Sequence, residues 1–101
     1  MVTHMKDHFY VYILASQRNG TLYIGVTSNL PKRIFEHKNE ITGGFTTEYG
    51  VKTLVHYEVF DDFENAVIRE KNIKAWKRQW KLELIEKQDP NWRDLYDDIN
   101  N

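Results

Sequence analysis

The stretch that decides the fold is residues 9–26, which have the sequence FYVYILASQRNGTLYIGV. Two runs within it, residues 9–14 and 21–26, are rich in the β-branched and aromatic side chains that favour strands. Asn19 and Gly20 stand between the runs and are typical of a hairpin turn. The stretch therefore predicts a β-hairpin.

Side chains of the hairpin alternate between the two faces of each strand. The period of two places Tyr10 and Tyr12 on one face of the first strand, and Tyr23 and Gly25 on one face of the second. A glycine inside a strand pattern indicates a bulge or the close approach of another group. We therefore expect another group to lie against Gly25.

A helix is predicted after the hairpin, running to about residue 39. Ser28 or Asn29 can cap it, and Pro31 suits its first turn. Residues 41–50 are rich in Gly and Thr and predict a loop, and residues 53–60 have the composition of a third strand.

The C-terminal part of the chain has a long helical pattern. Its apolar residues fall near one line at 100° per residue: Ala66, Ile73, Trp80 and Leu84. Lys77 falls in the middle of that line, which indicates a break around residues 75–78 and therefore two helices. Trp76 and Trp80, four residues apart, are interpreted as core residues.

These elements predict an α/β (α+β) fold, a small three-stranded sheet flanked by helices in the order β-β-α-β-α-α. Residues 9–88 form the expected domain, after a flexible N-terminus of residues 1–8. Residues 89–101 form an acidic tail whose apolar side chains, Trp92, Leu95 and Tyr96, are expected to dock on the domain.

Composition narrows the class of protein. The chain has 101 residues, a mass of 12.1 kDa, 14% aromatic residues and no cysteine. These values favour one packed domain and exclude a disulfide scaffold, a thiolate zinc site and a cysteine nucleophile. No apolar run reaches the ~18 residues of a membrane span, and no signal peptide is recognised, so we expect a cytoplasmic protein.

The net charge of −1 hides an uneven distribution. Residues 67–81 carry a net charge of +5, whereas residues 82–101 carry a net charge of −4. Four basic side chains of the first segment form a row at helical spacing: Lys71, Lys74, Arg78 and Lys81. Such a row is typical of a surface that follows nucleic-acid phosphates, and equally of a solvated helix face.

Several polar residues could carry chemistry. Glu70 lies on the apolar line of the long helix, where a carboxylate is costly to bury unless it is paired or bound to metal. A salt bridge to a neighbouring basic residue is the commoner reason for such a position. Arg33 and His37 lie one turn apart; arginine suits phosphate and histidine can relay a proton. A solvated helix face also explains that pair.

The order of these residues resembles a known family. Tyr12 closes the triplet Tyr10-Val11-Tyr12, and Tyr23-Ile24-Gly25 follows after ten residues. Arg33, His37 and then Glu70 come after the two motifs, on two predicted helices. This set resembles the signature of the GIY-YIG nuclease superfamily, and most closely its small stand-alone bacterial members. The first motif departs from Gly-Ile-Tyr, and Val26 replaces a lysine that many relatives have.

The resemblance implies an endonuclease that hydrolyses phosphodiester bonds of DNA, with structured or damaged DNA as its substrate and one Mg²⁺ or Mn²⁺ ion as its cofactor. Tyr23 or Tyr12 would help to activate the attacking water. Arg33 would hold the scissile phosphate, with His37 as a proton relay. Glu70 would bind the metal ion.

Further expectations concern DNA and partners. Gly25 and the basic row, Lys71, Lys74, Arg78 and Lys81, are predicted to contact DNA. A protein partner could supply targeting, and a monomer or weak dimer without membrane contact is expected. Two other hypotheses for the function stay open: a nucleic-acid-binding module that does not cleave DNA, and a protein-interaction module.

Overall fold

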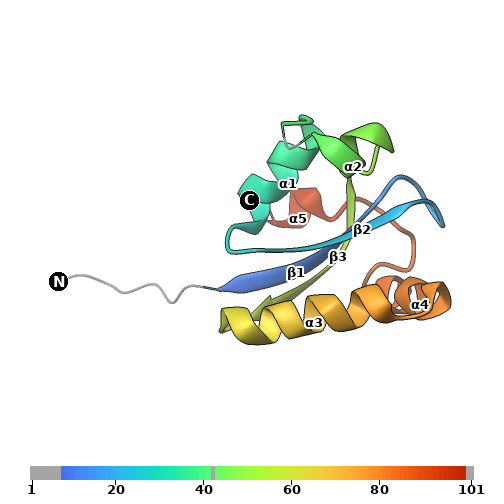
Figure 1. The fold of residues 1–101 in the computed structure, drawn as a ribbon. Coiled ribbons are helices and arrows are strands. Elements are labelled where there is room, and N and C mark those ends of the chain that lie inside the picture. The colour runs from blue at the N-terminus through green and yellow to red at the C-terminus, as the bar shows by residue number, and fades with distance from the viewer. Residues whose placement is uncertain (1–7, 42, 100–101) are drawn as a thin grey trace.

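The computed structural model describes residues 8–41 and 43–99 and is built on a three-stranded antiparallel sheet (Figure 1). Strand β1 (Phe9–Ala15) lies in the centre, between β2 (Leu22–Thr27) and β3 (Thr53–Phe60). The predicted hairpin and third strand are confirmed. The second strand begins one residue later than expected, because residues 16–21 form a longer turn with Asn19 at a φ of 57°.

Helices cover both faces of the sheet (Figure 1). Helices α1 (Leu30–Lys38), α2 (Gly44–Glu48) and α5 (Tyr96–Ile99) lie on one side. Helices α3 (Phe63–Ala75) and α4 (Arg78–Gln88) lie on the other. The fold class is thus confirmed, and two short helices, α2 and α5, extend the predicted order of elements.

Helix α1 begins as its sequence predicts. The Asn29 side chain accepts a hydrogen bond from the backbone N–H of Lys32 at 3.2 Å, and Pro31 occupies the first turn. Helix α2 was not predicted: residues 41–50 were expected to be a loop, but residues 44–48 complete one helical turn. Gly43 and Gly44 precede and open this turn with φ angles of 64° and 68°, which glycine adopts without strain.

The long C-terminal pattern does divide into two helices. Asp62 caps α3 by accepting a hydrogen bond from the Asn65 backbone at 3.2 Å, and Trp76 and Lys77 are extended, with ψ angles of 154° and 147°. The break was predicted from Lys77, although neither glycine nor proline occurs there. It rotates α4, so that Ile85 is buried and Trp80 is 49% exposed. The prediction of Trp80 as a core residue was therefore wrong.

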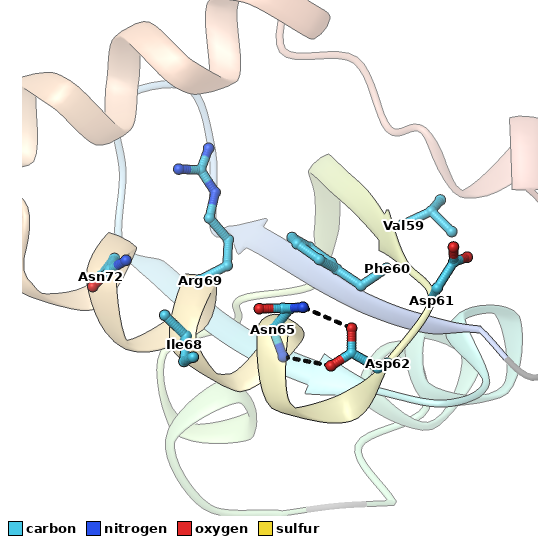
Figure 2. A pocket seen from close by; sticks show the side chains of 8 residues that line it. All are labelled: Val59, Phe60, Asp61, Asp62, Asn65, Ile68, Arg69 and Asn72. Carbon is cyan, nitrogen blue, oxygen red and sulfur yellow. Dashed lines mark hydrogen bonds between the residues drawn. The ribbon is translucent and has the colours of Figure 1, made fainter.

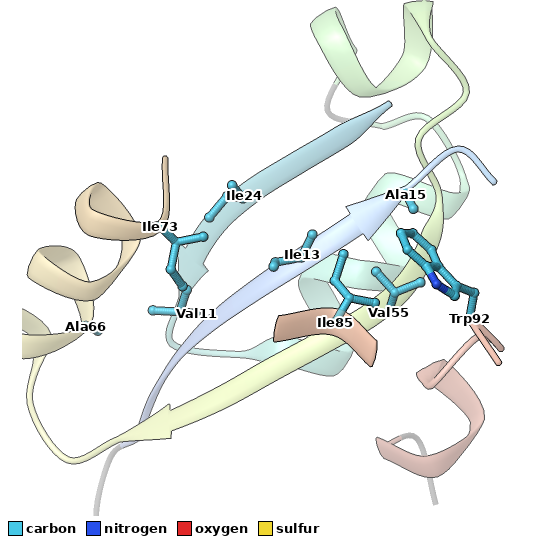
Figure 3. Packing of buried hydrophobic residues seen from close by; sticks show 9 residues of the cluster. All are labelled: Val11, Ile13, Ala15, Ile24, Val55, Ala66, Ile73, Ile85 and Trp92. Carbon is cyan, nitrogen blue, oxygen red and sulfur yellow. The ribbon is translucent and has the colours of Figure 1, made fainter. Parts of the chain in front are cut away.

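Two apolar clusters hold the layers together. The cluster between the sheet and helices α3 and α4 contains alternate residues of β1, namely Val11, Ile13 and Ala15, together with Ile24, Val55, Ala66, Ile73, Ile85 and Trp92 (Figure 3). The cluster on the other face contains Tyr12, Leu14, Leu30, Ile34, Val51, Leu54 and Leu95. The central strand is thus buried on both faces, as its near-continuous apolar sequence indicates.

The C-terminal segment packs on the domain in both clusters. Trp92 is 7% exposed in the first cluster, and Leu95 is 4% exposed in the second. The Leu95 backbone N–H donates to the Leu54 carbonyl at 2.8 Å, which ties the segment to the edge of β3. The expectation of a flexible N-terminus falls on residues that, apart from His8, lie outside the described ranges.

Helices long and apolar enough to cross a bilayer are absent from residues 8–41 and 43–99.

Candidate active site

The Tyr12 side chain lies close to the backbone of the neighbouring strand at Gly25. Tyr12 pairs with Gly25 across β1 and β2, and its side chain is fully buried. A Cβ at Gly25 would meet the Tyr12 hydroxyl at 2.5 Å, far inside van der Waals contact. The group expected against Gly25 is therefore the Tyr12 phenol, and the glycine makes room for it.

A line of polar contacts runs from Tyr12 through α1 to α2. The Tyr12 hydroxyl and His37 Nε2 are 3.0 Å apart, and His37 Nδ1 and Thr46 Oγ1 are 3.2 Å apart. His37 and Thr46 are each 3% exposed. Burial, and then the charge of Arg33, lower the pKa of His37, so its ring is neutral at neutral pH.

Arg33 joins this line at the Tyr12 hydroxyl. Burial raises the pKa of Tyr12 above the usual phenol range, and the hydrogen bond with Arg33 acts in the opposite direction. Arginine can only donate, so the Tyr12 oxygen accepts from Arg33 and its O–H is directed to His37 Nε2. A neutral His37 then donates from Nδ1 to Thr46. Tyr12 is thereby a protonated phenol that positions Arg33 and His37.

These side chains border a pocket of about 340 Å³. Its lining consists of Tyr23, Arg33, His37, Gly43, Phe45 and Thr46. The Arg33 side chain is 41% exposed, whereas its Nε is buried and has no hydrogen-bond partner among the described residues. A partly exposed guanidinium at a pocket fits an anion with several oxygens, such as a phosphate.

Three of the lining residues were not predicted: Gly43, Phe45 and Thr46. All three lie at or in α2, the segment that was expected to be a loop. Thr46 holds the second nitrogen of His37, and Phe45 forms a wall of the pocket. The Gly43-Gly44 pair was the available sequence signal, because two glycines before an aromatic residue can bring the backbone close to a site.

Glu70 lies on the other side of the sheet from α1 and α2 and does not line the pocket. It lies on α3, its side chain is 14% exposed, and its charge contributes to raising the pKa of Tyr12, after burial and a smaller effect of Tyr23. It also forms an ion pair with Lys74, with 3.0 Å between Oε2 and Nζ. The expected alternative, a salt bridge on the helix, is thus present.

The donor set around Glu70 suits a hard cation bound by few protein ligands. Groups of three or more His, Asp or Glu side chains are absent from the described part of the chain. Mg²⁺ is commonly held by one or two carboxylates, with water and substrate phosphate completing its shell. A single carboxylate on α3, with its side chain 14% exposed, fits that pattern.

The basic row does not form one helix face, which corrects the prediction. Lys71 and Lys74 lie on α3, whereas Arg78 and Lys81 lie on α4, beyond the break. Arg78 donates to the carbonyl oxygens of Asn19 and Gly20 at 2.7 and 2.6 Å, and thus secures the hairpin turn. Lys81 Nζ donates to the carbonyl oxygen of Lys74 at 3.2 Å, so this basic group gathers at the junction of the helices.

A separate pocket of about 510 Å³ lies beside the first turns of α3 (Figure 2). Three of its polar side chains, those of Asp62, Asn65 and Arg69, already have structural partners. Asp62 binds Asn65 at the helix cap, and Arg69 binds Glu58 with two hydrogen bonds of 2.8 and 2.9 Å. None of the predicted site residues lines it.

Comparison with known proteins identifies the family of the chain. Residues 8–83 match the family model described as the GIY-YIG catalytic domain. The UPF0213 protein of Staphylococcus saprophyticus is 38% identical over 79 residues, covering 78% of this chain and 95% of that protein. The UPF0213 protein of Clostridium perfringens is 42% identical over 76 residues, covering 75% of this chain and 81% of that protein.

A solved structure is also similar. The solution NMR structure of the UPF0213 protein BH0048 from Bacillus halodurans has a TM-score of 0.54 and 28% identity. The match covers 86% of this chain and 92% of that one.

Proposed function

The chain belongs to the GIY-YIG catalytic domain family, and from this premise we propose that it is a divalent-metal-dependent endonuclease that hydrolyses phosphodiester bonds of DNA. The observation that carries the proposal is the pocket shared by Tyr23, Arg33 and His37. Structured or damaged DNA is the proposed substrate.

Arg33 is the residue assigned to the scissile phosphate. Its guanidinium lies beside the Tyr12 hydroxyl on one side and faces Glu36 on the other, with 3.6 Å between Nη1 and Oε1. A guanidinium held in this way is preorganised to stabilise the charge that develops on the phosphate oxygens during displacement. The exposed part of the Arg33 guanidinium supplies the donors that substrate can engage, since the side chain is 41% exposed.

Tyr23 is the tyrosine assigned to the attacking water. It lines the pocket and is half-buried, whereas the Tyr12 phenol is fully buried, protonated and engaged with His37. A hydroxyl that is to orient water must reach solvent and substrate, which favours Tyr23. Tyr12 is assigned the role of a positioning residue.

His37 is assigned to the movement and placement of protons around Tyr12. As a neutral ring it accepts from the Tyr12 hydroxyl at Nε2 and donates to Thr46 at Nδ1. This arrangement lets a proton pass along the line when a phosphate binds at Arg33 and offsets its fixed positive charge. The ring also fixes the direction of the Tyr12 O–H bond.

Glu70 is assigned to the metal ion, for which Mg²⁺ or Mn²⁺ suits the oxygen ligands. A bound divalent ion would stabilise the negative charge on the leaving oxygen. The carboxylate is held by Lys74 in the described structure, and Lys74 is 52% exposed in its side chain, so it can turn away without loss of packing. Binding of DNA by Lys71, Lys74, Arg78 and Lys81 completes the proposal.

A nucleic-acid-binding module without cleavage is the second candidate. The Glu70–Lys74 ion pair favours it, since it satisfies the carboxylate without a metal ion. The two candidates differ in whether a metal-dependent product forms.

The test is cleavage of branched, nicked and plain duplex DNA with Mg²⁺ or Mn²⁺, comparing the wild type with Glu70→Ala. Glu64→Ala is a matched control, because Glu64 lies on the same helix and is exposed. We expect the loss of cleavage in Glu70→Ala alone, with an unchanged circular dichroism spectrum. Undiminished cleavage in Glu70→Ala would exclude Glu70 as the metal ligand, and the absence of any product in the wild type would favour the binding module.

A further inference from the structure

Two aromatic side chains on α2 are open to solvent beside the candidate active site. Phe45 is 46% exposed and Tyr49 is 51% exposed, and their ring centroids are 4.7 Å apart. Helix α2 has five residues, and Thr46 is its buried residue. The two rings therefore contribute little to the core, and their exposure calls for another explanation.

The rings continue an aromatic row that begins inside the pocket. The Tyr23 ring lies 5.4 Å from His37 and 6.3 Å from Phe45, measured between centroids. Phe45 lines the same pocket as Arg33. One pocket thus presents a guanidinium on α1 and an aromatic ring on α2, which are the two groups that recognise a phosphate and a nucleobase.

The state of the DNA strand decides whether a base can reach Phe45. In a duplex both faces of each base are covered by its neighbours in the stack. In an unpaired strand the base can turn away from its backbone and stack on an exposed ring. A phosphate at Arg33 with its adjacent base on Phe45 therefore requires an unpaired nucleotide.

We propose that Phe45 and Tyr49 form a stacking surface for the nucleobases next to the phosphate held by Arg33, so that the substrate is DNA with an unpaired strand at the cleavage point. This inference rests on the proposed function and narrows its substrate class from structured DNA to single-stranded segments such as flaps and gaps.

The first test measures binding without chemistry. Fluorescence anisotropy in EDTA compares a labelled oligothymidine with a blunt duplex, for the wild type, Phe45→Leu and Phe45→Trp. Leucine keeps apolar bulk but has no aromatic face. We expect Phe45→Leu to weaken binding of the single strand about tenfold, Phe45→Trp to retain it, and duplex binding to be unchanged in both. Tyr49→Leu is a second variant with a smaller expected loss.

Phe35→Leu is the matched control. Phe35 is 51% exposed on α1 and does not line the pocket. Equal affinity of Phe45→Leu and the wild type for the single strand would overturn the stacking surface. Equal losses on single strand and duplex, or a loss in Phe45→Trp as large as in Phe45→Leu, would overturn it too.

Cleavage with Mg²⁺ separates this inference from the proposed function. If the wild type prefers the single strand through Phe45 but cuts nothing, the stacking surface stands and the nuclease proposal fails. If the wild type cuts duplex and single strand at the same rate and Phe45→Leu changes neither rate, the nuclease proposal stands and the stacking surface fails.

Discussion

Tyr12 and Gly25 face each other across the β1–β2 pair, and the Tyr12 hydroxyl occupies the place where a side chain on Gly25 would begin. The ring is fully buried, and its hydroxyl holds His37 at 3.0 Å. A single glycine on an edge strand therefore determines where the phenol lies, and through the phenol where the site on α1 is held.

Replacement of Gly25 by alanine tests this relationship. The added Cβ would lie 2.5 Å from the Tyr12 hydroxyl and 2.6 Å from the adjacent ring carbon, so the whole ring must move. We expect Gly25→Ala to lower the free energy of unfolding by about 1–3 kcal/mol, the usual cost of overpacking. Urea unfolding measures the change.

The same substitution in a second variant shows whether contact with the Tyr12 ring causes the loss of stability. In a Tyr12→Leu protein the ring is absent, so the additional cost of Gly25→Ala should be much smaller than in the wild type. Equal costs in the two backgrounds would mean that Gly25 is required for a reason other than Tyr12.

Local patterns were sufficient to predict most of the fold. The hairpin turn, the Asn29 and Asp62 caps and the third strand depend on residues close together in sequence. Lys77 in an apolar line predicted the helix break. The orientation of α4 after that break depends on tertiary packing, and for this reason Trp80 was wrongly placed in the core and Ile85 was missed.

Only part of the candidate active site could be predicted from the sequence. Tyr12, Tyr23, Arg33 and His37 were singled out and lie together. Thr46 and Phe45 were missed because α2 is one turn long, and a single turn has no periodicity to detect. The contacts of Arg78 with the hairpin turn join residues 58 and 59 positions apart, which no local pattern encodes.

Removal of the Thr46 hydroxyl should disturb the neutral His37 ring. Thr46→Val keeps the shape of the side chain but deletes the partner of Nδ1 at 3.2 Å, which is buried. The expected cost is about 1–2 kcal/mol in the free energy of unfolding. Thr47→Val is the control, since Thr47 Oγ1 is buried without a hydrogen-bond partner among the described residues and its loss should not destabilise the fold. If Thr47→Val lowers the free energy of unfolding more than Thr46→Val does, the hydrogen bond between Thr46 and His37 is not the stabilising contact.

The stability of the protein at low pH should depend on Glu58. Burial alone would raise its pKa, but hydrogen bonds from His56 and Arg69 outweigh burial and hold the pKa at about 2, below the ordinary 4.5. A depressed pKa contributes stability above pH 4.5, and this is lost as the pH falls through 4.5 towards 2.

Glu58→Gln measures this contribution. We expect a loss of about 2 kcal/mol in urea unfolding near neutral pH, and a smaller loss at about pH 3, where the wild type has itself lost part of the stabilisation. Glu83→Gln is the control, because Glu83 is exposed and contacts Gln79 at 3.3 Å. If the difference in the free energy of unfolding between the wild type and Glu58→Gln stays constant with pH, the carboxylate charge is not the source of the stabilisation.

Lys74 should compete with the metal ion for Glu70. Its Nζ lies 3.0 Å from the carboxylate to which the divalent ion is assigned. Lys74→Ala frees this carboxylate and removes a positive charge beside it, and both changes favour a cation. An ion pair with one exposed partner contributes less than about 1 kcal/mol, so the half-saturating Mg²⁺ concentration should fall up to about fivefold.

Lys71→Ala separates this competition from the general effect of charge. Lys71 is exposed on the same helix, and the described ion pairs of Glu70 do not include it. Both variants should bind DNA more weakly at low salt, but only Lys74→Ala should bind Mn²⁺ more tightly in calorimetry without DNA. If both variants raise the Mn²⁺ affinity equally, Lys74 acts through the general positive charge of the helix and not through its ion pair with Glu70. If neither shifts it, the carboxylate that Lys74 holds is not the one that binds the ion.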